Sequence, residues 1–133
     1  MIQETEKAKP GYRKTKLGWI PEEWEISKIG GLTSKVGSGS TPRGGEAVYL
    51  NDGIPFIRSQ NVNGNKLLLD DIRFIPEEIH QKMSFSAVQA GDILLNITGA
   101  SIGRTCVVPK EFKEGNVNQH VCIIRTESII NTN

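Results

Sequence analysis

The hydrophobic pattern of the chain consists of short apolar runs separated by glycine-containing turns. The clearest run lies within Ile93–Ile97 and predicts a buried strand, and Ile102–Val108 predicts a second strand that returns beside it. Thr98, Ser101 and Arg104 lie between them, where the first strand stops at a glycine. A loop with so little side-chain bulk lets the backbone approach a ligand closely. We therefore expect a contact surface here, with an ordinary hairpin and polar tip as the alternative.

The rest of the pattern predicts further short strands and a short helix. Gly53–Arg58 is a strand candidate, and Asn63-Gly64 is typical of the turn to a return strand at Lys66–Leu69. The run Ile75–Met83 predicts a helix that begins near a proline, and Asn116–Ile124 predicts the last strand. The pattern as a whole predicts an α+β domain with a twisted, mostly antiparallel sheet of short strands and one or two short helices.

The N-terminal residues divide into a polar and an apolar part. Residues 1–16 are charged and nearly free of large apolar side chains, which indicates a flexible leader. Leu17–Trp24 is apolar around a proline, so we expect it to anchor onto a domain that extends over residues 17–133. Core packing is the favoured interpretation for Trp19 and Trp24, and stacking on bases is the alternative.

Composition narrows the function classes only a little. The 16 Lys and Arg residues nearly balance 15 Asp and Glu residues, so a basic patch for nucleic acid must be local. Cys106 and Cys122 lie far from zinc-ligand spacing and inside apolar runs, which favours buried free thiols. No signal-peptide pattern and no run near the ~20 apolar residues of a membrane span is visible. We expect a cytoplasmic protein without membrane association, metal or cofactor.

Two further loops carry residues suited to nucleic acid. Lys35–Gly45 offers unhindered backbone N–H groups, hydroxyls and flanking cations, but it lacks the Gly-Lys-Ser/Thr of a nucleotide-binding loop. A plain surface loop and contact with a nucleic-acid backbone both remain open. Arg58, Gln60 and Asn61 begin an amide-rich loop; Asn and Gln side chains fit adenine in the major groove, and Arg fits guanine. For these three residues, base reading and turn formation are equally supported.

No arrangement of catalytic groups is visible in the sequence. The adjacent carboxylates Asp70-Asp71 and Glu77-Glu78 lie in turn and helix-start contexts, and Ser101 lacks the Gly-x-Ser-x-Gly setting of a nucleophile. We therefore expect a protein that recognises a surface, with no catalytic residues of its own.

Five phrases of the sequence, in this order, resemble the target recognition domain of the specificity subunit in type I restriction–modification systems. They are Leu17–Trp24 (LGWIPEEW), Gly39–Pro42 (GSTP), Ile54–Arg58 (IPFIR), Gly91–Arg104 (GDILLNITGASIGR) and Asn118-Gln119 (NQ). The resemblance implies sequence-specific binding of double-stranded DNA by a noncatalytic subunit. It also implies partners that carry the chemistry, namely a DNA methyltransferase (modification) subunit and a restriction subunit.

The chain departs from that family where it stops soon after the Asn118-Gln119 phrase. The family's PLPPxxEQ phrase and spacer helix are missing, so we expect an incomplete recognition domain. The alternative function is a truncated fragment that serves as a protein-interaction module, with possible self-association and no DNA binding of its own.

The loops Gly37–Gly44, Ser59–Asn65 and Thr98–Arg104 are expected to converge on the DNA, together with the polar entrance of the last strand. The predicted DNA-binding residues are Ser38, Ser40, Thr41, Arg43, Arg58, Ser59, Gln60, Asn61, Thr98, Ser101, Arg104, Asn118 and Gln119.

Overall fold

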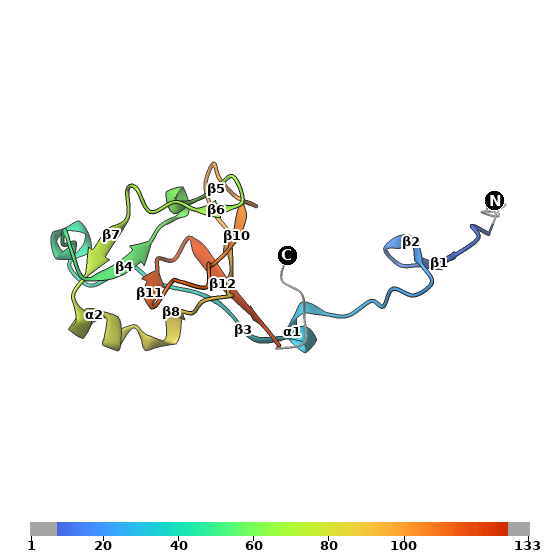
Figure 1. Cartoon of the computed structure of the whole chain (residues 1–133), viewed down its shortest axis with the longest axis horizontal. Helices are drawn as coiled ribbons and strands as arrows, with labels where there is room; N and C mark the ends of the chain where they lie inside the picture. Colours follow the sequence, from blue (N-terminus) through green and yellow to red (C-terminus); the bar gives the residue numbers. More distant parts are fainter. Residues whose placement is uncertain (1–7, 128–133) are drawn as a thin grey trace.

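The computed structural model describes residues 8–127, which form two four-stranded sheets and two small hairpins (Figure 1). The first sheet is antiparallel throughout, in the order β10 (Thr105–Val107), β9 (Ile93–Asn96), β12 (Val121–Thr126) and β3 (Thr33–Ser38). The second has the order β7 (Arg73–Ile75), β4 (Ile54–Ile57), β11 (Gly115–Val117) and β8 (Ala87–Val88). Its β4–β11 pair is parallel and its other pairs are antiparallel.

The remaining elements are short. The hairpins are β1 (Tyr12–Thr15) with β2 (Gly18–Pro21) and β5 (Val62–Asn63) with β6 (Lys66–Leu67). The helices are α1 (Ile29–Leu32) and α2 (Glu77–Lys82), with 3-10 turns at Gly45–Val48, Ser59–Asn61 and Ser84–Ser86. The predicted α+β class is confirmed, with two sheets where we expected one. None of the helices within residues 8–127 is long and apolar enough to cross a membrane.

The core consists of two clusters on opposite faces of the second sheet. Because strand side chains alternate between faces, Phe56 and Ile57 point in opposite directions. Ile57 belongs to the larger cluster, where the two sheets meet, and Phe56 packs with Ile54, Ile75 and Met83 near α2. The larger cluster contains Ile57, Val62, Val88, Leu94, Cys106, Val108, Val117, Val121 and Ile123. Cys106 and Cys122 are buried free thiols, as predicted.

The strand predicted at Asn116–Ile124 is wrong as a single element. Its two ends lie in different sheets, as β11 and β12. Asn118 makes the break, because its side-chain Oδ1 accepts a hydrogen bond of 3.0 Å from the His120 N–H, as in an Asx turn. The Asn118 N–H also donates to the Ile57 carbonyl at 3.1 Å, which joins the turn to the end of β4.

The loop predicted at Lys35–Gly45 begins later than expected. Thr33–Ser38 forms β3 and pairs with β12, so the loop starts at Gly39. A Cβ atom on Gly39 would lie 1.8 Å from the Val117 carbonyl oxygen, so only glycine fits there without a backbone shift. The second strand of the β9–β10 pair also begins late, at Thr105, because Gly103 turns back to donate to the Asn96 carbonyl at 2.8 Å.

The N-terminal hairpin stands apart from the rest of the described chain, at the end of an extended segment (Figure 1). Trp24 is 60 % exposed and Leu17 is 77 % exposed, so the prediction that this segment packs onto the domain was wrong. The β1–β2 pairing satisfies the backbone hydrogen bonds locally and needs no contact with the core. The hairpin also includes Tyr12–Thr15, which we expected in a flexible leader; residues 1–7 of that leader lie outside the described residues.

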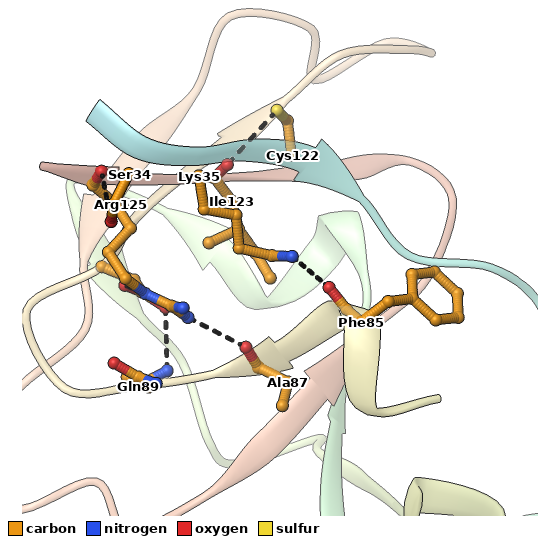
Figure 2. A network of polar contacts seen from close by, with 9 residues as sticks. Ser34, Lys35, Phe85, Ala87, Gln89, Cys122, Ile123 and Arg125 are labelled. Atoms are coloured by element: carbon orange, nitrogen blue, oxygen red, sulfur yellow. Dashed lines mark hydrogen bonds and ion pairs between the residues drawn. The ribbon is translucent and has the colours of Figure 1, made fainter. Parts of the chain in front are cut away.

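A charged contact joins the first sheet to the turn before β9. Arg125 donates to both carboxylate oxygens of Asp92, at 2.8 and 2.9 Å, and to the Ala87 carbonyl at 3.1 Å. Figure 2 shows the guanidinium reaching Ala87, and beside it the Lys35 ammonium bonded to the Phe85 carbonyl. The hydrogen bonds that Arg125 donates to Asp92, which is 1 % exposed, raise the pKa of Arg125. The guanidinium therefore stays charged, and its bond to the Ala87 carbonyl ties β12 to β8.

Candidate nucleic-acid interface

Two of the three predicted loops line one hollow of about 360 Å³, here called the Ser101 hollow. The 3-10 turn after β4 supplies one wall, and the β9–β10 loop supplies the other. Its lining residues are Ser59, Gln60, Thr98, Gly99, Ala100, Ser101, Arg104 and His120. The structure thus brings together five of the residues predicted to bind DNA: Ser59, Gln60, Thr98, Ser101 and Arg104.

Asn96, the last residue of β9, holds the two walls of the Ser101 hollow together. Its buried side-chain amide donates to the Ser59 carbonyl at 2.9 Å and to the Ser101 hydroxyl at 3.1 Å. Its backbone N–H donates to the Arg104 carbonyl at 2.9 Å. Asn96 was not among the residues predicted from the sequence, where its only signal was one amide within an otherwise apolar run.

His120 adds to this site a side chain that was not among the predicted DNA-binding residues. Its Nδ1 is hydrogen-bonded to the Thr98 hydroxyl, so the turn between β11 and β12 contacts the β9–β10 loop. His120 follows Gln119, a predicted site residue that is exposed. The Asn118–His120 turn therefore forms part of the same surface.

The third predicted loop lies against this turn. The Thr41 hydroxyl donates a hydrogen bond of 2.7 Å to Gln119 Oε1. Thr41 also lines a second hollow of about 440 Å³, here called the Phe85 hollow. Its lining residues are Ser40, Thr41, Pro42, Arg43, Ile79, Lys82, Met83 and Phe85. Two hydrogen bonds, Thr41–Gln119 and His120–Thr98, connect the linings of the two hollows, so all three loops contribute to one mainly polar surface.

Arg58 and Asn61, for which base reading and turn formation were equally supported by the sequence, have side chains that are hydrogen-bonded at the turn after β4. The Arg58 side chain is 13 % exposed and donates to the Asp71 carbonyl at 2.9 Å, with the Asp71 carboxylate 3.5 Å away. The buried Asn61 side chain accepts from the Arg58 N–H at 2.9 Å and donates to the Leu68 carbonyl at 3.0 Å. Both side chains are occupied in fixing the turn after β4.

Two further predicted residues also support the surface from within. The side chain of Asn118 caps its own turn, as described above. Ser38 lies in β3, opposite Cys122 of β12, at the start of the loop that leads to Thr41. The geometry therefore assigns Asn118 and Ser38 to the stems of the loops and leaves Ser40, Thr41, Arg43 and Gln119 near their tips.

The charged side chains that line the two hollows are all positive. Arg104 lines the Ser101 hollow, and Arg43 and Lys82 line the Phe85 hollow, with no Asp or Glu among the described lining residues of either. Within residues 8–127, no carboxylate lies close enough to any of these three cations to form an ion pair. A chain with a net charge of +1 thus concentrates unpaired positive charge on one surface.

The other histidine, His80, belongs to a buried polar cluster beside β11. Its Nδ1 lies 3.2 Å from the Asn116 side-chain nitrogen, and its Nε2 lies 3.6 Å from the Glu114 carboxylate. The burial of His80 within this cluster favours a structural role. Within the described part of the chain, no group of three or more His, Cys, Asp and Glu residues is placed to hold a metal ion.

The sequence model of one protein family, described as the type I restriction modification DNA specificity domain, matches residues 21–133. The chain belongs to this family. The match covers most of the chain and includes all three loops of the polar surface, so the resemblance seen in the sequence is confirmed.

Individual relatives agree with this assignment. The specificity domain is 27 % identical over 92 residues to the type I restriction enzyme MjaVIII specificity subunit of Methanocaldococcus jannaschii; the aligned part is 69 % of this chain and 21 % of that protein. Its fold is similar to the HsdS subunit from Thermoanaerobacter tengcongensis, with a TM-score of 0.55, 14 % identity, and coverage of 95 % of this chain and 26 % of that one.

A second solved chain, from work on complex assembly and conformational transition of the type I R-M system, gives a TM-score of 0.53 at 16 % identity. It also covers 95 % of this chain and 26 % of its own length. The specificity domain therefore spans about a quarter of the length of the relatives that it matches.

Proposed function

We propose that this specificity domain binds double-stranded DNA in a sequence-specific manner as part of a type I specificity subunit. Bound in this way, it directs the methyltransferase (modification) and restriction subunits to their site. One observation carries the proposal: three loops bring unpaired cations, hydroxyls and amides onto one surface, and its two hollows have no acidic side chain among their described lining residues. Such a surface complements the phosphates and base edges of a duplex.

The residues of the surface divide by chemistry. Arg43, Lys82 and Arg104 neutralise phosphates, and the Ser and Thr hydroxyls donate to phosphate oxygens. Gln60 is exposed and its amide has no hydrogen-bond partner within residues 8–127, so it is free to pair with the edge of a base. A Gln side chain is suited to the N6/N7 edge of adenine.

Selection of bound duplexes from a randomised pool, followed by affinity measurements over a range of salt concentrations, tests this proposal. The 133-residue chain should enrich a defined sequence, and Arg104→Ala should weaken binding and lower the salt slope by about one unit. Lys113→Ala is the matched control, because Lys113 is exposed and lines a different, mainly apolar cavity. Lack of duplex binding, or equal behaviour of the two variants, would contradict the proposal.

A protein-binding role is the second candidate function. It is favoured by the exposed apolar side chains of the N-terminal hairpin and the segment that follows it, namely Leu17, Trp24, Ile26, Ile29 and Leu32. Sedimentation of the chain without DNA tests this role. Self-association that is lost in Trp24→Ala, together with absence of duplex binding, would favour this second role.

A further inference from the structure

Phe85 is an apolar side chain on an otherwise polar and cationic surface. It is 55 % exposed and lines the Phe85 hollow together with Pro42, Ile79 and Met83. Pro42 and Met83 are buried, and Ile79 is partly buried, so these side chains form an apolar floor. Arg43 and Lys82 line the same hollow. Neither Phe85 nor Lys82 was among the residues predicted from the sequence to contact DNA.

The position of Phe85 is fixed by buried hydrogen bonds on both sides of it. The Ser86 hydroxyl donates to Asn116 Oδ1 at 2.6 Å, and the Asn116 amide donates to the Met83 carbonyl at 2.8 Å. The Lys35 ammonium is bonded to the carbonyl of Phe85 itself (Figure 2). These bonds fix the backbone on both sides of Phe85, and its ring lies exposed at the surface.

We propose that Phe85 contacts the 5-methyl group of a pyrimidine in the major groove, an inference that rests on the proposed binding of duplex DNA. The apolar floor carries no side-chain donor or acceptor that could pair with the polar atoms of a base edge. The methyl group of thymine, or of 5-methylcytosine, is the apolar feature that a base pair presents in the major groove. Arg43 and Lys82 contact the phosphates on either side and hold the methyl group over the ring.

The test compares thymine with uracil, which differ only by this methyl group. A duplex selected by the wild-type chain is prepared with each thymine replaced singly by uracil, and the affinities are measured for wild type and for Phe85→Ala. At one position, wild type should bind the uracil duplex about fourfold more weakly, as expected when one methyl group is no longer buried. In Phe85→Ala this ratio should fall to about one.

Two further comparisons define the contact. Phe85→Leu keeps an apolar side chain and should retain part of the thymine preference, and thermal unfolding confirms that each variant is folded. Leu69→Ala is the matched control, because it removes an exposed apolar side chain that lines a different cavity. At the same position, the affinities for duplexes with 5-methylcytosine and with cytosine are also compared. A preference for 5-methylcytosine shows that the methyl group alone is recognised, and no preference shows that other atoms of thymine are needed.

The outcomes separate this inference from the proposed function. Duplex binding with no thymine–uracil difference at any position, or with the same difference in Phe85→Ala as in wild type, would overturn the role of Phe85 alone. Absence of duplex binding by the wild-type chain would overturn both.

Discussion

Thr41 and Gln119 lie 78 positions apart in the sequence, yet the hydroxyl of one donates a 2.7 Å hydrogen bond to the side-chain oxygen of the other. The bond joins the loop after β3 to the turn between β11 and β12. The next residue, His120, is bonded in turn to Thr98. Two exposed hydrogen bonds in series thus connect the lining of the Phe85 hollow to that of the Ser101 hollow.

Replacing Thr41 with valine removes this bond and keeps the shape of the side chain. We expect the affinity for a selected duplex to fall about two- to tenfold, the loss that corresponds to one hydrogen bond of ~0.5–1.5 kcal/mol. Thermal stability should change little because the bond is exposed. Thr15→Val is the control, since its hydroxyl makes a similar bond to Gly18 in the N-terminal hairpin. Equal affinities of the two variants would contradict this role of Thr41.

Asn96→Ala should destabilise the domain, because the buried amide of Asn96 binds both the Ser59 carbonyl and the Ser101 hydroxyl. We expect a loss of about 2–3 kcal/mol in the free energy of unfolding, from unsatisfied buried groups and the cavity left behind. Urea unfolding measures it. Hydrogen exchange should also accelerate at the Gly103 amide. Asn63→Ala, at an exposed position in a hairpin, should leave both quantities nearly unchanged.

Arg125→Ala leaves the buried Asp92 carboxylate without its cation. We expect a decrease of about 2–4 kcal/mol in the free energy of unfolding, measured by denaturant titration, because removal of one partner of a buried pair strands the other charge. Part of the loss should be recovered in the double variant Arg125→Ala with Asp92→Ala. Arg43→Ala, at an exposed arginine without an ion pair within residues 8–127, should weaken DNA binding and leave stability unchanged. A similar loss of stability in Arg125→Ala and Arg43→Ala would contradict the stabilising role of the Arg125–Asp92 pair.

Cys106 should make the stability depend on pH in the alkaline range. Burial raises the pKa of its thiol from 9.0 to about 11, so above pH 9 the unfolded chain loses this proton before the folded one does. The folded state then binds more protons, and the free energy of unfolding falls as pH rises from 9 to 11. Urea titrations at pH 8 and pH 11 should show a smaller fall in Cys106→Ala. An equal decrease in the free energy of unfolding for wild type and Cys106→Ala would contradict this role of the Cys106 thiol.

Elements set by local pattern were predictable from the sequence. The strand β4 and the helix α2 follow from their apolar spacing and from Pro76, which lies at the cap of the helix. The hairpin turn after Asn63 follows from Gly64 and Asn65, which have φ angles of 60° and 62° and match the left-handed region that Asn and Gly tolerate.

Elements that depend on distant partners could not be predicted. Val36 and Gly37 carry no strand pattern of their own, and β3 forms because β12 pairs with it. Likewise, the Arg58 guanidinium is chemically suited to bind a base, but in the fold it donates a hydrogen bond to the Asp71 carbonyl. The position of Asp71 depends on the tertiary fold and could not be predicted from the local sequence. Lys82 and Phe85 joined the candidate surface for the same reason, since α2 and the following turn are brought beside Thr41 only on folding.

The close approach of Gly39 to the Val117 carbonyl has a consequence for how this surface varies. The root of the loop is clamped by main-chain contact, which does not depend on the side chains that follow. We therefore expect that exchange of the exposed residues Thr41 and Arg43 changes what the loop contacts while the backbone at its base stays in place, provided that residue 39 remains glycine.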